Sequence, residues 1–537
     1  MIMIRRRRPQ RGLLATAAIS TVLMATGVAM ADTPRDTVVM AKQIDDIISL
    51  DPAESFEFSS GEVLGNLYDR LLTYDYENVA DIRGQLAESW RVADDGKTYT
   101  FKMRPGVKFA SGNPVTASDA VFSLQRAVIL NKSPGFILTQ FGFTKDNLKE
   151  RIRAADPQTL VIVTEKPVAP SFFYYCLTSV VGSIVDSNLV QEKAKGDDFG
   201  NEWLKTNSAG SGAYKLRSWR ASEAVTLDAA DGYWDGAPGN KRVVIRHVPE
   251  PATQRLLLEK GDIDFARNLT KDQLDAIKSN PDIAMQSHGK SQILYIGLNQ
   301  KNPTLAKPEV REALKYLVDY NGIEKNILSG TWVPHQAFLP TGMLGAIDDK
   351  PYRLDVAKAK ELLAKAGVAN GFTVSIDTRN VSPFTDVAQA IQSTFAQAGI
   401  KLEIQPAEYR QVLTKYRARN QDMVFVEWGS DYQDPHSNAE TFAVNEDNSD
   451  NARSKTLAWR NSWDIPEMTK QALAAVTEPD TAKRAAEYQA IQREHQQVSP
   501  FVIMFQQVEV AAHRKTADGF VLGPSFDTDR YRGITKK

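Results

Sequence analysis

The sequence predicts an α/β protein, and two regions with different patterns support that prediction. From 308 to 428, short apolar runs alternate with stretches of helical periodicity. From 84 to 126, alternating hydrophobic residues flank a polar turn, which is typical of a β-hairpin. The 537 residues suffice for about three or four domain-sized units. The composition, with 42% hydrophobic and 24% charged residues, is that of a folded globular protein.

The N-terminus has the pattern of a secretory signal peptide. Five arginines lie among the first eleven residues, and no charged residue follows from Leu13 to Ala31. Ala29 and Ala31 provide the small residues of an A-x-A cleavage site. Cleavage after Ala31 removes five of the 65 basic residues and none of the 66 acidic ones, which leaves a net charge near -6. This balance gives no reason to expect nucleic-acid binding.

The exported chain is expected to be free in the periplasm. No cysteine follows the cleavage site, so a lipid anchor is not predicted. An uncleaved anchor helix is the alternative interpretation of the apolar stretch, and the arginine run also raises twin-arginine export beside the general secretory route. We expect a monomer.

The region 84–126 predicts a hairpin followed by a helix. Asp94-Asp95-Gly96-Lys97 forms the predicted turn, after which Tyr99, Phe101 and Met103 alternate. Thr116 and Asp119 have the spacing of a capping box at a helix start.

Further along, 209–250 is rich in predicted strands, and Gly210-Ser211-Gly212 is predicted to form a tight turn. Cys176 stands in the apolar run 172–177, which predicts a buried, inert thiol.

The region 308–428 predicts an α/β domain with a largely parallel sheet. Pro308 and Asp355 suit helix starts, and Gly367 and Gly399 suit helix ends. The predicted helices begin near 308, 355, 382 and 409, and the predicted strands are 372–376, 402–404 and 423–428.

Motifs of catalysis are missing from the sequence. There is no G-x-S-x-G, H-E-x-x-H or G-x-G-x-x-G. Gly96-Lys97-Thr98 has the tail of a phosphate-binding loop, but Arg91 stands where that loop needs its first glycine. The six histidines are dispersed, and one cysteine excludes a thiolate cluster and an intramolecular disulfide. We therefore expect no enzymatic activity, no metal and no cofactor, with a secreted hydrolase as the alternative.

One long segment resembles a known family. Residues 86–123, LAESWRVADDGKTYTFKMRPGVKFASGNPVTASDAVFS, closely resemble the signature of bacterial extracellular solute-binding proteins of family 5. One departure is Ala110-Ser111, where many relatives have His-Asp. Four later segments extend the resemblance: Gly210–Leu216, Asp231-Gly232-Tyr233-Trp234, Leu256–Asp264 and Tyr295–Asn299.

The resemblance implies a periplasmic-binding-protein-like α/β fold with two hinged lobes, an accessory domain and discontinuous lobes. It also implies that ligand binding shifts an open–closed equilibrium and that the closed form docks on a membrane permease. The predicted division is 1–31 signal peptide, 32–66 lobe 1, 67–208 accessory domain, 209–296 lobe 1, 297–505 lobe 2 and 506–537 lobe 1.

The resemblance also implies ligand-binding residues. In peptide-binding relatives the aspartate of W-x-x-D-Y accepts the ligand's ammonium group, which here is Asp431, and Trp428 would form an apolar wall. The loop after the strand at 372–376 resembles R-x-x-x-P, whose arginine pairs with the ligand's carboxylate, here Arg379. Residues 55–62, especially Ser59 and Ser60, match a loop that faces the cleft in relatives. Two opposite charges suit a zwitterion, since a buried ion needs a partner.

The family comprises binding components of ABC importers, so the resemblance implies solute capture and delivery. Our first hypothesis is a short peptide with free termini. An opine or another amino-acid conjugate is the second, and a nickel chelate is the third.

Overall fold

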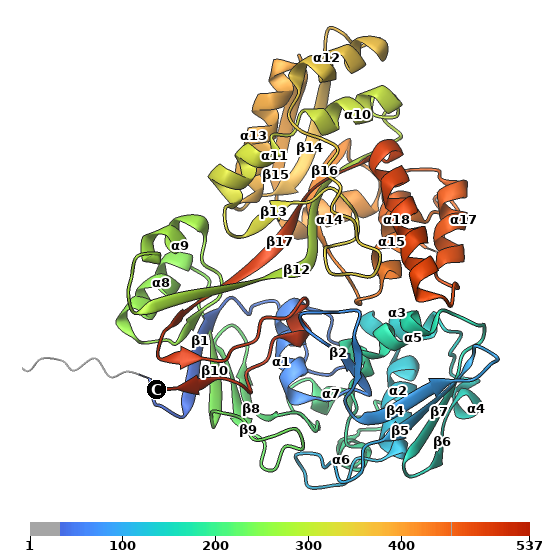
Figure 1. Cartoon of the computed structure of the whole chain (residues 1–537), viewed down its shortest axis with the longest axis vertical. Helices are drawn as coiled ribbons and strands as arrows, with labels where there is room; N and C mark the ends of the chain where they lie inside the picture. Colours follow the sequence, from blue (N-terminus) through green and yellow to red (C-terminus); the bar gives the residue numbers. More distant parts are fainter. Residues whose placement is uncertain (1–32, 453) are drawn as a thin grey trace, which may run out of the picture.

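The computed structural model describes residues 33–452 and 454–537, so the predicted signal peptide lies outside the described residues. One large mixed sheet runs through both the lower and the upper parts of the molecule (Figure 1). Its strands follow the spatial order β15 (Lys401–Ala407), β14 (Thr373–Arg379), β16 (Met423–Gly429), β12 (Ile283–Leu298), β17 (Phe501–Arg514), β11 (Phe265–Ala266), β1 (Thr37–Lys42), β10 (Arg242–His247), β9 (Ala224–Ala229) and β8 (Tyr214–Arg220). A short strand, β13 (Trp332–Pro334), pairs with β17.

The upper lobe confirms the predicted alternation of strands and helices. Strand β14 pairs in parallel with both β15 and β16. Asp355 accepts from the Lys358 N–H at the start of its helix, and Pro308 opens another helix at its first position. The helices that cover these strands are α10 (Pro308–Tyr316), α11 (Tyr320–Ile323), α12 (Val356–Lys365), α13 (Phe384–Gln397) and α14 (Tyr409–Arg417).

Three helices complete this lobe on the side of the accessory domain. Arg484 forms two ion-paired hydrogen bonds with Asp434, at 2.6 and 2.7 Å, and donates another to Ser171 of the accessory domain at 3.0 Å. This contact holds the chain that follows β16 against the lower part of the molecule. The helices are α15 (Pro435–Ala443), α17 (Pro466–Ala475) and α18 (Thr481–Val498), with α16 (Leu457–Arg460) between them along the chain.

The accessory domain is a four-stranded antiparallel sheet with helices packed on it. The predicted hairpin is confirmed, because its two strands pair around the turn at 94–97. The capping box of Thr116 and Asp119 is present, and Cys176 is fully buried in the core. The elements are β4 (Ala87–Val92), β5 (Thr98–Met103), β7 (Thr159–Val163), β6 (Ile152–Asp156), α2 (Ala117–Leu130), α3 (Phe136–Thr139), α4 (Leu148–Arg151), α5 (Pro170–Leu177), α6 (Ser187–Lys193) and α7 (Asn201–Leu204). The hairpin of β2 (Leu72–Tyr74) and β3 (Ile82–Gly84) precedes them.

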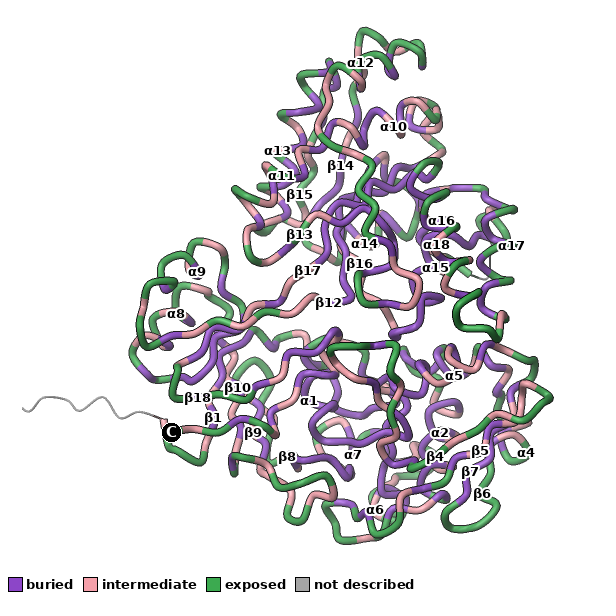
Figure 2. Tube along the Cα trace, in the orientation of Figure 1, coloured by how far each residue is buried: buried purple, intermediate pink, exposed green. Residues whose placement is uncertain are grey.

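Helix α1 (Phe58–Leu67) lies at the centre of the lower part and is buried along most of its length (Figure 2). The prediction of a tight turn at 210–212 needs correction, since this stretch runs close along the end of α1. The Gly212 N–H donates to the Leu67 carbonyl at 3.0 Å, and a Cβ on Gly210 would lie 2.0 Å from the same oxygen. These glycines therefore permit close backbone packing. Helices α8 (Pro251–Lys260) and α9 (Lys271–Ile277) flank this lobe.

Two long neighbouring strands, β12 and β17, link the lobes (Figure 1). Their pairing is interrupted between Gly289 and Ile293, where the register shifts. The bulge separates pairing near the lower lobe from pairing beside β16, so it has the position of a hinge. The predicted domain boundaries stay predictions. Among the described residues, no helix is both long and apolar enough to span a membrane.

Candidate functional site

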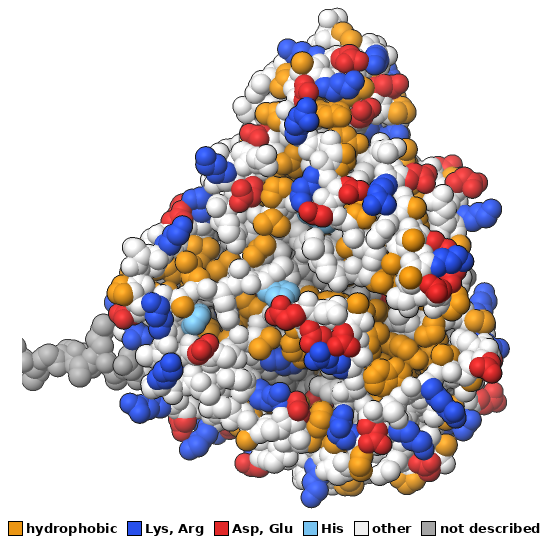
Figure 3. Space-filling model, viewed as in Figure 1, with side chains coloured by type: hydrophobic (Ala, Val, Ile, Leu, Met, Phe, Trp, Pro, Cys, Tyr) orange, Lys and Arg blue, Asp and Glu red, His pale blue; other side chains and the backbone are white. Residues whose placement is uncertain are grey.

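A cavity of about 200 Å³ lies beside this bulge. Figure 3 shows the molecule hollowed between its upper and lower parts, with hydrophobic side chains gathered along the lower rim. Five chain segments line most of the cavity, 55–58, 178–181, 290–292, 429–433 and 524–527, and the single residues Gly61, Tyr74, Pro134 and Ile137 complete its wall. Both lobes, the accessory domain and the bulge therefore meet around one partly open cavity, as a ligand site between hinged lobes requires.

Asp431 lies in the wall of this cavity, as predicted for a ligand-binding residue. Its backbone N–H donates to Ser437 Oγ at 2.8 Å. Within the described chain, its carboxylate has no hydrogen bond or ion pair, unlike the other carboxylates discussed below. Burial, followed by the nearby Glu440 carboxylate, raises the pKa of Asp431 to about 7. A desolvated carboxylate in this state is stabilised by a cationic ligand.

Backbone contacts with the bulge hold the Asp431 loop in place. The Ser430 N–H donates to the Ser291 carbonyl at 2.9 Å, and Ser291 Oγ donates to Gln433 Oε1 at 2.8 Å. Gly429 ends β16, and a Cβ there would lie 2.9 Å from the ring of Phe58 on the other lobe. Glycine at 429 thus lets the two lobes touch across the cleft.

Aromatic side chains and a second carboxylate form the opposite wall. Phe56 and Phe58 are 43% and 47% exposed, and the Phe58 ring lies 4.9 Å from that of Phe526. Glu57 Oε2 accepts from the Phe56 N–H and from Ser60 Oγ, and in the described structure it has no ion pair. Asp527 also lines the cavity, but it pairs with Arg70 at 2.7 Å. The wall is therefore apolar and acidic.

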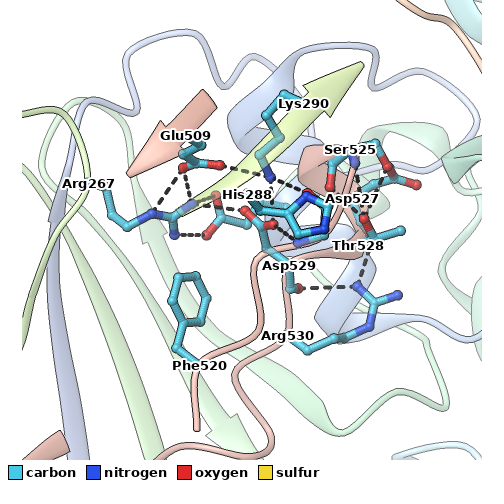
Figure 4. Close-up of polar contacts among 12 residues, drawn as sticks. Arg267, His288, Lys290, Glu509, Phe520, Ser525, Asp527, Thr528, Asp529 and Arg530 are labelled. Carbon is cyan, nitrogen blue, oxygen red and sulfur yellow. Dashed lines mark hydrogen bonds and ion pairs between the residues drawn. The ribbon is translucent and has the colours of Figure 1, made fainter. Parts of the chain in front are cut away.

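Lys290 is the basic residue that lines the cavity, and its ammonium group is already occupied. It donates to the Gly523 carbonyl and to Asp529 Oδ1, each at 2.8 Å, and lies 2.8 Å from Glu509 Oε2 (Figure 4). Against the desolvation that burial imposes, the carboxylates of Asp529 and Glu509 raise its pKa. Lys290 therefore belongs to a buried ion-pair network, and two carboxylates already balance its charge.

That network, which we call the hinge network, consists of Lys42, Glu62, Arg267, Lys290, Glu509 and Asp529. Arg267 is its centre and pairs with Glu62 at 2.6 Å, with Asp529 at 2.9 Å and with Glu509 (Figure 4). It contains three basic and three acidic groups from six separate parts of the chain. Each carboxylate in it has a cationic partner, as buried charges require.

The structure places Arg379 outside the cavity, and it is the last residue of β14 rather than part of the predicted loop, because the strand extends three residues beyond the predicted end. Its Nη1 donates to Glu427 Oε1 at 2.8 Å, and its guanidinium lies 4.8 Å from the Phe384 ring and 4.7 Å from the Tyr409 ring. Glu427 precedes the Asp431 loop by four residues on β16. Arg379 and Asp431 are thus not brought to one cavity in this conformation, because Arg379 is held by a carboxylate of its own lobe.

The other predicted residues lie near the cavity without lining it. Trp428 packs in the core of the upper lobe, 6.4 Å from the Phe442 ring, and its indole N–H is buried without a partner in the described structure. Ser59 Oγ donates to the Gln43 carbonyl, and Ser60 Oγ donates to Glu57. Their hydroxyls therefore stabilise the start of α1.

Sequence reasoning missed Lys290 and Phe526. It included Glu57 and Phe58 in the loop 55–62 that faces the cleft, but it singled out Ser59 and Ser60 instead, although the run Phe56-Glu57-Phe58 sets an acid between two aromatic residues. Nothing in the sequence near 290 or 526 links those positions to the loop at 431, because long-range strand pairing brings them together.

Comparisons with known proteins agree with this arrangement. The model of bacterial extracellular solute-binding proteins, family 5, matches residues 81–450. A probable D,D-dipeptide-binding periplasmic protein of Escherichia coli K12, DdpA, is 29% identical over 504 residues, covering 93% of this chain and 94% of that protein. The glutathione-binding protein GsiB of the same strain is 27% identical over 528 residues, covering 96% and 97%.

A solved structure gives the same result for the fold. The periplasmic binding protein DppA from Helicobacter pylori, in complex with the peptide STSA, superposes with a TM-score of 0.77 at 25% identity. The superposition covers 93% of this chain and 98% of that one. The predicted two-lobe α/β fold is thereby confirmed, and this chain belongs to the bacterial extracellular solute-binding proteins of family 5.

Proposed function

We propose that this protein captures a short peptide with a free ammonium group and delivers it to the membrane permease of an ABC importer. The observation that carries the proposal is the Asp431 carboxylate, which faces the cavity and has no partner among the residues described. An ammonium group supplies both the opposite charge and the hydrogen-bond donors that this carboxylate lacks. The names of the relatives, which include a dipeptide-binding protein and a peptide complex, support the same ligand class.

The walls of the cavity restrict the rest of the ligand. Phe56, Phe58 and Phe526 favour an apolar side chain beside the ammonium group, and an aromatic face also attracts a cation. A volume of about 200 Å³ is below the range of roughly 300–1,000 Å³ that is usual for drug-sized ligands, so one or two residues suit it best. We therefore propose a dipeptide rather than a longer peptide.

The zwitterion hypothesis also needs a cationic partner for the ligand's carboxylate. Lys290 is occupied, so a carboxylate in the cavity has no unpaired cation in the described structure. The predicted role of Arg379 requires its guanidinium to leave Glu427 when the lobes move. An opine, which also presents an amine, remains our second ligand hypothesis.

Calorimetric titration with matched ligands tests the proposal. We expect a dipeptide with an apolar first residue to bind, and its N-acetylated form to bind at least about 30-fold more weakly, since removing one partner of a buried charged pair costs about 2–5 kcal/mol. Asp431→Asn should remove that difference. Equal affinity for the free and acetylated peptides would contradict the ammonium role, and titration of opines and a nickel–histidine chelate would then identify the alternative ligand.

Export to the periplasm is part of the proposal. The signal-peptide pattern supports cleavage after Ala31. N-terminal sequencing of protein isolated from the periplasmic fraction should begin at Asp32. An N-terminus at residue 1 would instead indicate an uncleaved anchor.

A further inference from the structure

A second cavity, of about 530 Å³, lies beside the first and shares Tyr74 with it as a wall residue. It is formed where the lower lobe, the hairpin of β2 and β3 and the C-terminal segment meet. Its lining is polar and includes four arginines: Arg83, Arg104, Arg530 and Arg532. The acidic residues that line it are Asp69, Asp75 and Asp235.

Two of the segments that resemble the family converge on this cavity. Tyr233 and Trp234 come from the Asp-Gly-Tyr-Trp segment, and Arg104 comes from the long segment 86–123. The Tyr233 hydroxyl and the Trp234 indole N–H donate to Asp69 at 3.0 and 2.8 Å. These contacts fix the two aromatic rings in the wall.

Asp69 is buried, and four neutral donors occupy its carboxylate. Besides Tyr233 and Trp234, Gln85 donates to it at 2.7 Å and Ser211 at 3.0 Å. Among the described residues it forms no ion pair with Arg104 or Arg530, although the charge of Arg530 partly offsets the rise in its pKa that burial causes. Its hydrogen bonds hold the wall of the cavity.

Arg104 is pre-oriented and lacks an acidic partner in the described structure. Its guanidinium lies 4.6 Å from the Trp234 ring, and its Nε donates to the Gln85 carbonyl at 3.0 Å. Both terminal nitrogens are without a hydrogen bond among the described residues. A guanidinium stacked on a ring is held in one plane and presents its remaining N–H groups together.

Arg530 is the second such group. Its Nη1 donates to the carbonyls of Asp527 and Asp529, at 2.8 and 3.2 Å, and its guanidinium lies 5.4 Å from the Tyr76 ring. Its partners are carbonyls of the turn at 527–529, which includes Asp529 of the hinge network, but it pairs with no carboxylate of that network in the described structure (Figure 4). Its other nitrogens have no hydrogen-bond partner in the part of the chain that the structure describes.

The other two arginines are neutralised by acids of the same cavity. Arg83 lies 2.8 Å from Asp75, and Arg532 lies 2.5 Å from Asp235.

Arg104 and Arg530 form no ion pair among the described residues, although the nearby carboxylates of Asp69 and Asp527 interact with Arg530 electrostatically. The cavity therefore presents the unbonded N–H groups of two guanidiniums, in a space large enough for a small molecule.

From this geometry we infer a second ligand site, specific for a small doubly charged oxyanion held between Arg104 and Arg530. Phosphate, sulfate and short dicarboxylates share this chemistry. Each offers several acceptor oxygens to planar N–H donors, which is the pairing that guanidinium groups favour. The site is separate from the Asp431 cavity and of opposite charge preference.

Calorimetry of the exported chain with sodium phosphate, sulfate and succinate tests the inference. The titrations are made in chloride buffer at constant ionic strength, so that general screening does not vary. We expect at least one of these anions to bind saturably at one site, with a dissociation constant below about 1 mM. Which anion binds most tightly identifies the oxyanion class.

Variants distinguish this site from general electrostatic attraction. Arg104→Gln should weaken the anion by about tenfold or more, since a hydrogen bond to a charged group contributes about 1.5–3 kcal/mol. Arg104→Lys keeps the charge but loses the planar fork, so it should give an intermediate affinity. Arg83→Gln is the matched control, an exposed, ion-paired arginine of the same cavity, and should change the affinity less than about threefold.

Two results would overturn the inference. One is the absence of saturable binding for all three anions. The other is a loss for Arg104→Gln no larger than that for Arg83→Gln. Arg530→Gln should repeat the Arg104 result, but Arg530 also binds the turn at 527–529. The Arg104 variants are therefore the decisive test, once an unchanged melting temperature shows that they are folded.

Discussion

The hinge network and the Asp431 cavity lie side by side at the bulge of β12. They differ in whether their carboxylates are paired with basic residues. In the hinge network, Glu62, Glu509 and Asp529 each have a cationic partner, and Arg267 is fully buried between them. In the cavity, Asp431 has a raised pKa and no partner among the described residues. The comparison separates buried charge that holds the lobes in register from buried charge that is available to a ligand.

Removing the centre of the hinge network should have the largest effect. Arg267→Met leaves three buried carboxylates without their shared partner, so we expect the free energy of unfolding to fall by about 3–5 kcal/mol. Urea denaturation followed by circular dichroism measures this. The control is Arg255→Met, which removes a partly exposed ion pair with Glu259 and should cost less than about 1 kcal/mol. If both variants lowered the free energy of unfolding equally, the hinge network would contribute no more to stability than a partly exposed ion pair.

Removing the charge of Asp431 should act in the opposite direction on the unliganded protein. Its pKa is raised to about 7 in the folded state, so its ionised form costs stability as pH rises from about 4 to 7, and this cost is constant above that. Asp431→Asn should therefore raise the free energy of unfolding by about 1–3 kcal/mol at pH 8, and hardly at all at pH 4. Denaturation at both pH values measures the difference, and a destabilised variant at pH 8 would refute it.

The affinity for an ammonium ligand should depend on pH through the same group. Below the pKa of about 7, Asp431 takes up a proton that the ligand must displace. From pH 8 to pH 6, protonation of Asp431 alone lowers the affinity about tenfold, but the α-amino group of the ligand, with a pKa of about 7.7–8.0, becomes fully protonated over the same range. We therefore expect a net loss of about fourfold, or about 0.8 kcal/mol. Titration of a dipeptide at several pH values measures it, and the Asp431→Asn variant should lack the loss at pH 6, so that only protonation of the ligand's α-amino group shapes its profile. A flat profile for the unmodified chain would assign the ligand to another group.

Arg379 should have the smallest effect. Because it pairs with Glu427 on a partly exposed face, Arg379→Gln should change dipeptide affinity by less than about 1 kcal/mol. A loss as large as that for Asp431→Asn would instead support the zwitterion hypothesis, with Arg379 moving into the cavity when ligand binds. Calorimetry of the two variants side by side makes this comparison.

The contrast between Asp431 and Arg379 shows how much of a residue's role a sequence motif can predict. Arg379 is the last residue of β14 and Asp431 lies two residues after the end of β16, the parallel neighbour of β14, and both were predicted from a motif. Asp431 lines the cavity because its loop is bonded to the bulge at 291. Arg379 instead donates to Glu427, which lies on a neighbouring strand two positions before Gly429. A motif specifies the residue type. Tertiary packing determines whether another residue of the protein pairs with it in place of a ligand.

The sequence by itself determined the local elements and the family. Periodicity and end signals predicted the strands and helices of 308–428, because these follow from contacts within a few residues. Only the tertiary structure decided which charges are paired. The partners of Arg267 lie at 62, 509 and 529, and the walls of the cavity come from segments more than 400 residues apart. Long-range contacts decide whether a buried charge is paired with another residue of the protein or stays available to a ligand. No local sequence pattern encodes these contacts.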